Sequence, residues 1–307
     1  MWVALDQGEI VGEVGSIPVR FQCGKETFPA AQTCDVTILP DYQKEGAFFR
    51  LYGESAKEHI GRGILFVYGF SIPKTLQIST TLLGYHPVCP VRRWVLILNP
   101  GPYIAKRFRS PLLGRLAGPL GRRLVRRRLR RMHRRGGDGI VTEVLRFDER
   151  FDRFWEERRN DHEIMVVRDS EYLNWRYADH PMGRYRILAS FSGDRVRGFI
   201  VLTTAVDEVR RGFIMDLMVD PAEKEVFDPL LAAALDFFQR EKIDHVSLWL
   251  PERDLFGKEF ERWGFVRKDS PHHLIARWTE RPAPAVDPDY LTTSENWHFT
   301  LGDSDYH

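Results

Sequence analysis

The chain has 307 residues, 43% hydrophobic and 12% aromatic, which is enough for two domains with their own cores. No stretch approaches the roughly 18 consecutive apolar residues of a membrane span, and the N-terminus lacks the basic start of a signal peptide. Three cysteines, Cys23, Cys34 and Cys89, lack metal-ligand spacing and predict reduced, mostly buried thiols. We therefore expect a cytoplasmic protein without a metal site.

The net charge of +2 hides one strongly basic segment. Thirteen Lys or Arg and no Asp or Glu lie between Lys106 and Arg135. The rest of the chain is therefore acidic, and this local block needs a local explanation.

The first hundred residues predict one compact α/β unit. Its expected order is two strands, a central strand, a helix, a strand, a short helix and a last strand. These elements fall at 2–6, 9–22, 35–39, 47–59, 64–68, the residues up to 83, and 91–98. The run Asn99-Pro100-Gly101-Pro102 then marks a boundary.

Residues 103–140 predict an arginine-rich linker helix. Gly118-Pro119 suits its start, and apolar residues at nearly helical spacing form one side. These are Leu120, Leu124, Val125, Leu129 and Met132. Three interpretations remain open for Arg122–Arg135: a solvated linker, contact with anionic lipid headgroups, or contact with RNA. The lack of interleaved aromatic residues disfavours nucleic acid.

The second half predicts further helices and strands. Helices are expected around 147–155, from the Asp228-Pro229 cap to 238, and at 256–263 before Gly264. Strands are expected near 163–168, 184–191, 196–203, 212–219, 245–250, 273–279 and 296–301.

Landmarks of the first half recur in the second, which indicates a duplicated domain. An Asp is followed five residues later by Pro, and then, 49 or 48 residues after the Asp, by a Gly-aromatic pair. They are Asp35, Pro40 and Gly84-Tyr85 in the first half, and Asp216, Pro221 and Gly264-Phe265 in the second.

The loop after the first central strand has the pattern of an anion site. Pro40 ends the strand, Gln43 and Gly46 follow at a spacing of three, and a helix then opens. Its backbone N–H groups and the helix N-terminus can converge on a phosphate, and Gly46 lacks the Cβ that would keep the phosphate away.

This loop and the order of elements resemble the GNAT superfamily of N-acetyltransferases, in the tandem form found in bacteria. Phe48 stands where that family usually carries Gly or Ala. The stretches 168–177 and 297–305 also resemble that group. The resemblance implies an α/β (α+β) fold of two GNAT-like domains, each with a mixed, largely antiparallel sheet flanked by helices. It divides the chain into a half that carries the cofactor loop, a linker helix and a second half, at residues 1–102, 103–140 and 141–307.

The resemblance also implies acetyl-CoA as co-substrate, held by the first half. The binding residues carried over are Ile38, Leu39, Gln43, Lys44, Glu45, Gly46, Ala47 and Phe48. The first half lacks the opening strand and two helices of the family. The loop of the second half has no Gly but contains Glu223, Glu225 and Asp228, which would repel a pyrophosphate.

In the family's mechanism an amine attacks the thioester directly. Asp35 is the candidate general base, because a strand Asp among apolar neighbours should have a raised pKa; the alternative is a purely structural Asp. Thr80 occupies the position of the usual acid, a Tyr, and is much weaker. Tyr68 is the candidate replacement, and Tyr85 a second one that should instead pack as Phe265 does.

The leading hypothesis is an acetyl-CoA-dependent N-acetyltransferase acting on an acceptor amine, such as an amino sugar of cell-surface polysaccharide synthesis. The alternatives are a Fem-type aminoacyl transferase that uses aminoacyl-tRNA, and a non-catalytic binding module. We expect a cytoplasmic protein that associates reversibly with the inner membrane surface through Arg122–Arg135.

Overall fold

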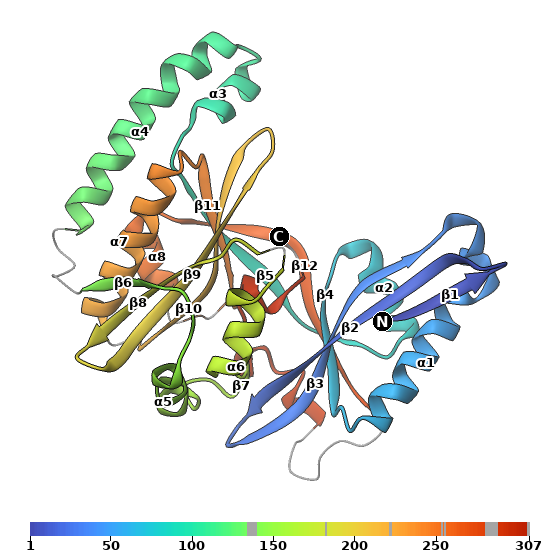
Figure 1. Ribbon diagram of the computed structural model, residues 1–307. Helices are drawn as coiled ribbons and strands as arrows, with labels where there is room; N and C mark the ends of the chain where they lie inside the picture. The colour runs from blue at the N-terminus through green and yellow to red at the C-terminus, as the bar shows by residue number, and fades with distance from the viewer. Residues whose placement is uncertain are drawn as a thin grey trace. The chain divides into compact units, whose positions relative to one another are not determined.

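The computed structural model describes residues 1–133, 140–181, 183–220, 223–252, 254, 256–279 and 288–305. The chain forms two compact units (Figure 1). Unit 1 contains Met1–Val91, Asn160–Val167 and Ser270–His298, and unit 2 contains Arg92–Arg159, Arg168–Asp269 and Phe299–His307. Each unit therefore draws on both halves of the sequence, unlike the contiguous halves that the sequence suggests.

Unit 1 is a mixed sheet with helix α1 lying along its first strands (Figure 1). The strand order is β1-β2-β3-β4-β12, and β7 also pairs with β2. Among the pairings that the structure describes in this unit, β3 with β4 is parallel and the others are antiparallel. The elements are β1 (Trp2–Asp6), β2 (Glu9–Cys23), β3 (Glu26–Ile38), η1 (Pro40–Glu45), α1 (Ala47–Gly61), β4 (Phe66–Ser71), α2 (Pro73–Leu82), β7 (Ile164–Val166), η3 (Pro288–Tyr290) and η4 (Ser294–Asn296), with parts of β5 (His86–Ile97) and β12 (Val266–Trp278).

The two faces of this sheet carry different cores, because successive strand residues alternate between faces. Val67 of β4 packs with Leu51 and Tyr52 of α1. Its neighbour Tyr68 lies edge-on to Phe21, at 5.1 Å between ring centroids. The α1 face is thus mainly aliphatic, and the opposite face is aromatic.

Unit 2 has the strand order β5-β11-β10-β9-β8-β6; over its described residues β10 and β11 pair in parallel and the other pairs are antiparallel. Helices α7 and α8 cover a large apolar core, and α4 lies beside α7 (Figure 1). The elements are α3 (Gly101–Phe108), α4 (Pro111–His133), β6 (Val141–Val144), α5 (Glu149–Arg158), α6 (Ser170–Leu173), η2 (Asn174–Ala178), β8 (Arg186–Ser192), β9 (Arg195–Val206), β10 (Arg210–Val219), α7 (Lys224–Arg240), β11 (His245–Leu250), α8 (Gly257–Trp263) and η5 (Leu301–Asp303).

The last strand of each sequence half is exchanged. Strand β5 is the last strand of the first half but pairs with β11, through Arg92–Ile97. Strand β12 comes late in the second half but pairs with β4, through residues 273–278. This reciprocal exchange, together with β7, explains why the compact units mix the sequence halves.

Matching positions in the two units have matching geometry. Gly12 lies opposite Ile38, and Gly198 lies opposite Val219, in each case three residues after the landmark Asp. A Cβ on either glycine would lie within 2.6 Å of the side chain it faces. Gly84 and Gly264 both have positive φ, 69° and 95°, where a helix ends. These paired steric requirements agree with the repeated landmarks of the sequence.

The expected α+β fold, with a mostly antiparallel sheet flanked by helices, is confirmed. Four local predictions are wrong. The linker helix begins at Pro111 rather than at Gly118-Pro119, so Pro119 lies inside α4, and Pro229 lies inside α7. The expected strand at 296–301 is reduced to an isolated bridge at Trp297, between the short 3-10 turns η4 and η5. The central strand β3 begins at Glu26, well before Asp35.

Candidate functional site

The predicted anion loop lies between β3 and α1 of unit 1. Pro40 opens the 3-10 turn η1, and Gly46 ends that turn and begins α1 with φ at 73°. This left-handed conformation favours glycine, and nothing lies within 4 Å of where a Cβ would be. Gln43 donates from its amide nitrogen to the Ile38 carbonyl oxygen at 3.1 Å, which closes the loop onto the end of β3.

The N-terminus of α1 is electrostatically open. No side chain caps it among the described residues, and its first turn contains no acidic residue. An α-helix begins with N–H groups that have no partner inside the helix, and its dipole is positive there. Ala47 and Phe48 supply the first turn, with Ala47 buried and Phe48 packed on Tyr52 at 4.9 Å. The end of α1 can therefore receive an anion.

The other predicted loop residues are placed as follows. Ile38 is half-buried against the α1 core, and Leu39 is 46% exposed. The side chains of Lys44 and Glu45 lie outside the described part of the chain. The structure thus places Gln43 and Gly46 in one loop, which Gln43 joins to Ile38 at the end of β3.

The parallel strands β3 and β4 pair over only three residues each. Ala30–Gln32 lie opposite Phe66–Tyr68, whereas β3 continues to Ile38 and β4 to Ser71. A bulge interrupts β3 beside Asp35, which has φ at 47°. Beyond Gln32 the backbone groups of β3 no longer pair with β4, and the bulge redirects the strand. These groups can therefore face a ligand.

Asp35 lies at this bulge and is exposed. The apolar surroundings expected for it from its strand neighbours are therefore absent, because the bulge turns the residue out of the regular alternation. Its candidacy as a base stays a prediction that rests on position alone.

The three candidate acids are not brought together. Tyr68 is buried on the aromatic face, edge-on to Phe21. Thr80 donates its hydroxyl to the carbonyl oxygens of Leu76 and Gln77 in its own helix, at 3.0 and 3.2 Å, so it is already committed to the backbone. Tyr85 contacts β3 near the bulge.

Tyr85 packs as expected and also makes a polar contact that the sequence did not predict. It is 3% exposed, with the Arg277 guanidinium 5.4 Å from its ring centre. Its hydroxyl lies 2.9 Å from Thr33 Oγ1, two residues before Asp35. Burial, and then the neighbouring Tyr85, raise the pKa of Tyr52, which extends this buried pair to α1. Only the Gly-aromatic landmark pointed to Tyr85.

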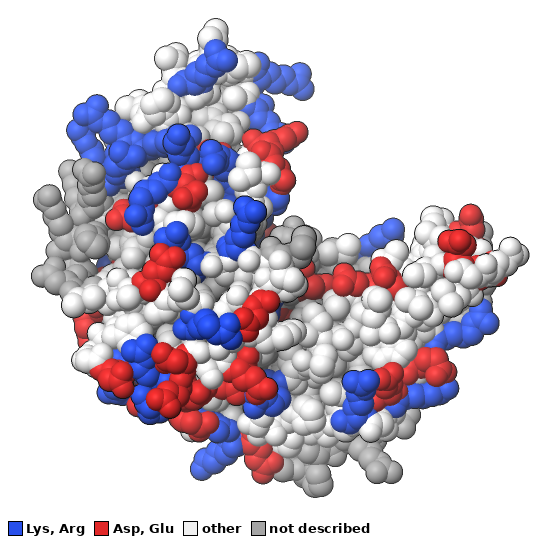
Figure 2. Space-filling view, in the orientation of Figure 1, with Lys and Arg blue, Asp and Glu red and all other residues white. Residues whose placement is uncertain are grey.

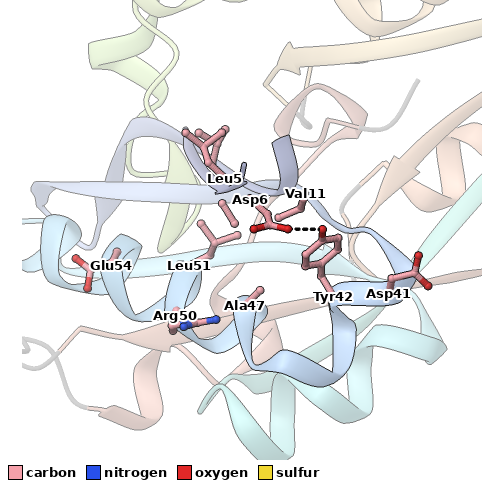
Figure 3. Close-up of a pocket in the computed structure, with 11 residues that line it drawn as sticks. Leu5, Asp6, Val11, Asp41, Tyr42, Ala47, Arg50, Leu51 and Glu54 are labelled. Carbon is pink, nitrogen blue, oxygen red and sulfur yellow. Dashed lines mark hydrogen bonds between the residues drawn. The ribbon is translucent and has the colours of Figure 1, made fainter. Parts of the chain in front are cut away.

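A pocket of about 720 Å³ lies beside the loop, between β1 and the η1–α1 segment (Figure 3). Tyr42 closes one side by donating its hydroxyl to Asp6 Oδ2 at 2.7 Å. Asp41 and Glu54 add two more carboxylates, and Arg50 is the cation among the lining residues. This lining suits a cationic group better than a phosphate, so the anion site is confined to the helix N-terminus.

The corresponding position in unit 2 is occupied by the chain itself. Strands β10 and β11 pair only through Arg211–Phe213 and His245–Ser247, and η5 contacts both strands. A Cβ on Gly302 would lie 3.0 Å from the Met215 carbonyl oxygen. The segment Leu301–Asp303 therefore lies against the part of β10 that does not pair with β11.

A buried charge network fixes this segment. The Arg168 guanidinium bonds to Asp216 and, at 2.6 Å, to Asp303. Arg176 donates to the carbonyl oxygens of Gly302 and Ser304, both at 2.9 Å. Burial opposes the charge of Arg168, but Asp216 and Asp303 raise its pKa well above the usual range. Asp216, the counterpart of Asp35, is thus a structural residue.

Among the described residues, no group of three His, Cys, Asp or Glu side chains is placed to hold a metal ion. Cys23, Cys34 and Cys89 are buried thiols that form no disulfide. Burial raises the pKa of Cys23 to about 12, so this thiol stays protonated and is a poor nucleophile.

Comparison with known proteins agrees with this geometry. Residues 1–77, which include the loop and α1, match the sequence model of the acetyltransferase (GNAT) domain. No curated protein matches the chain in sequence.

Solved structures are similar in fold over most of the chain. A conserved Enterococcus faecalis protein of unknown function has a TM-score of 0.57 and 14% identity, over 90% of this chain and 61% of its own. A GCN5-related N-acetyltransferase from Anabaena variabilis has a TM-score of 0.59 and 14% identity, over 91% and 62%. Saccharomyces cerevisiae N-myristoyltransferase, solved with myristoyl-CoA, has a TM-score of 0.59 and 9% identity, over 94% and 70%.

The chain thus spans 61% and 62% of the length of the first two of these proteins. Residues 1–77 therefore match a GNAT acetyltransferase domain, and the chain is similar in fold to a GCN5-related N-acetyltransferase.

Proposed function

We propose that the protein is an acyl-CoA-dependent N-acyltransferase, with acetyl-CoA as donor and an amine as acceptor. The observation that carries the proposal is the uncapped N-terminus of α1 behind Gly46, inside the segment that matches the GNAT domain. The pyrophosphate of the donor would accept from the first N–H groups of α1, and Gly46 would leave room for it. Because one structure of similar fold is an N-myristoyltransferase, the length of the acyl chain that the protein accepts must also be tested.

The reaction needs no co-reactant beyond these two substrates. The ammonium first gives one proton to a base. The amine nitrogen then forms a bond to the thioester carbonyl carbon, and the carbon–sulfur bond breaks. The nitrogen loses a second proton as the amide forms, which balances the proton that the departing thiolate takes up. Asp35 is our candidate for the first transfer, because it lies exposed at the bulge where β3 leaves β4. Thr80 is a poor candidate for protonating the thiolate, because its hydroxyl is bonded to its own helix.

We further propose that unit 2 does not bind the donor. The segment Leu301–Asp303 lies against β10 and β11 there, and the buried Arg168 network holds it. The chain would then be a tandem protein with one working cofactor loop. An amino sugar of cell-surface polysaccharide synthesis remains our candidate for the acceptor.

The test is calorimetric titration of the whole chain with acetyl-CoA, CoA and myristoyl-CoA. Gly46→Asp and Gly46→Asn form the matched pair, because both side chains tolerate positive φ and have nearly the same shape. We expect Gly46→Asn to keep most of the affinity and Gly46→Asp to lose at least about tenfold, because its charge faces the pyrophosphate. Absence of binding by the native chain, or equal affinity of the two variants, would refute the cofactor site.

Turnover separates an enzyme from a binding module. The native chain is incubated with acetyl-CoA and a panel of amino sugars, polyamines and peptides, and released CoA thiol is measured. Amine-dependent release supports the transferase. Acetyl-CoA binding without transfer to any amine would favour a binding module, and tight, salt-sensitive tRNA binding without CoA binding would favour the Fem-type alternative.

A further inference from the structure

Helix α4 exposes a row of leucines. Leu112, Leu116, Leu120 and Leu124 follow each other at intervals of four residues, which keeps neighbours on one side of a helix. Their exposed fractions run from 57% at Leu124 to 74% at Leu116. Leu113 and Phe108, at the end of α3, are also exposed. We call these six residues the leucine face.

The exposure of these leucines is a consequence of how α4 packs, because α4 places glycines, its smallest residues, against the 99–101 segment and the start of α3. A Cβ on Gly114 would lie 2.8 Å from the Gly101 carbonyl oxygen, and one on Gly121 would lie 2.2 Å from Pro100 Cγ. A Cβ on Gly118 would lie 3.0 Å from Asn99 Oδ1. An ordinary surface helix buries its leucines and exposes its small and polar residues. Here glycines fix α4 against α3, and the leucines are held outward.

The apolar side predicted from the sequence is therefore divided. Val125, Leu129 and Met132 pack on the core of unit 2, near α7. Leu120 and Leu124 instead belong to the leucine face. The solvated-linker interpretation explains neither the outward leucines nor their alignment.

The arginines are divided in the same way. Arg122 approaches Asp244 at 3.6 Å, Arg126 bonds to Gln239, and Arg128 bonds to the Arg262 carbonyl oxygen. Other cations have no acidic partner within the part of the chain that the structure describes: Lys106, Arg107, Arg109, Arg115, Arg123 and Arg127. Figure 2 shows blue side chains gathered over the place of α3 and α4 in Figure 1, with uncharged surface between them.

We propose that the leucine face and these cations form a binding surface for an anionic lipid bilayer. A helix that carries leucines on its outer side and cations beside them suits the interfacial plane, with the leucines among acyl chains and the guanidinium groups on phosphates. None of the helices among the described residues is long and apolar enough to cross a membrane. The helix therefore lies along the bilayer surface.

Charge selects this occupant over two others. A second copy of the chain would bring the same uncompensated cations face to face. RNA would pair with the cations but would leave at least four leucines in water, and α4 carries no Phe, Tyr or Trp for base stacking. The contact is independent of acyl-CoA binding.

The experiment is co-sedimentation of the whole chain with vesicles of phosphatidylcholine alone or mixed with phosphatidylglycerol. We expect stronger binding to the mixed vesicles. Leu116→Asp combined with Leu120→Asp should abolish it. Arg123→Gln combined with Arg127→Gln should weaken it about tenfold or more. The matched control, Leu82→Asp with Leu145→Asp, changes two exposed leucines elsewhere and should bind as the native chain does.

A second readout does not depend on removing a contact. Tryptophan replaces Leu116 in one variant and Leu145 in another, and the difference in emission from the native chain is recorded. Mixed vesicles should shift the emission of the first to the blue and leave the second unchanged. Equal binding to both vesicle types overturns the proposal. So does unchanged binding by the Leu116→Asp, Leu120→Asp variant, or a dimer that this variant dissociates while vesicles bind neither form.

Discussion

Arg168 and Asp216 form an ion pair in the interior of unit 2, with 3.2 Å between Nε and Oδ2 and both side chains 1% exposed. Asp216 also accepts from the Tyr177 hydroxyl at 3.0 Å. In a pair this deeply buried each charge stabilises the other, since burying either charge alone would carry a large desolvation cost.

We expect Arg168→Met to destabilise the protein by about 3–5 kcal/mol, because it leaves two buried carboxylates without their cation. Urea unfolding measures the loss. The control is Arg146→Met, which breaks an exposed pair with Asp179 in the same unit and should leave the urea midpoint almost unchanged. Equal midpoints for the two variants would contradict a structural role of the network.

Gly302→Ala should destabilise the protein by about 1–3 kcal/mol through overpacking. The new Cβ would lie 2.0 Å from the Tyr177 hydroxyl oxygen and 3.0 Å from the Met215 carbonyl oxygen, so the segment must shift. The matched control is Gly53→Ala in α1, where nothing lies within 4 Å. This control should stabilise by up to about 1 kcal/mol, because alanine favours a helix interior. The same sign for both variants in thermal unfolding would contradict the tight placement of Gly302.

His59 should make stability depend on pH. Burial, and then Arg277, lower its pKa, so the folded state binds its proton less readily than the unfolded state. Its contribution to stability is present above the unfolded pKa of about 6.5 and is lost as the pH falls below that value. We therefore expect His59→Gln to lose less stability than the native protein between pH 7.5 and 5.5, roughly the window below that pKa.

Urea unfolding at the two pH values gives this difference. His86→Gln replaces an exposed histidine of the same unit and serves as the control. A native-like pH dependence in His59→Gln would show that other groups carry the effect.

Asp35→Asn should lower kcat for acetyl transfer by about 100-fold or more without changing the affinity for acetyl-CoA, because it removes only the base. The control is Asp41→Asn, which alters a pocket carboxylate six residues later and should retain near-native kcat. The rate of CoA release at saturating amine is the measurement. Near-native turnover by Asp35→Asn would leave Asp35 with the structural role that Asp216 has.

Local patterns predicted the elements of this fold well. The first hairpin turns at Gln7 and Gly8, both with positive φ, and α8 ends at Gly264 as expected. Their signals are contained in a few neighbouring residues. Strand exchange has no such signal, because the partner of β4 is chosen by packing between residues some two hundred positions apart.

The candidate site was predictable to the same extent. The loop around Gly46 is defined by local spacing, and the structure places it at the start of a helix as expected. The contact between Tyr85 and Thr33 joins distant residues and had no local signal. The inward face of α4 was also hidden, because periodicity counts leucines as buried and cannot anticipate a helix held by glycines.

The exchange of β5 and β12 determines when each sheet can be completed during translation. When a ribosome has released β4, the strand that completes its sheet still lies most of the chain away, so the edge of β4 stays open during most of translation. Unit 2 receives β5 early but waits for β11. A gene cut between the sequence halves would yield two fragments with complementary open edges, prone to aggregate alone and able to complete each other when made together.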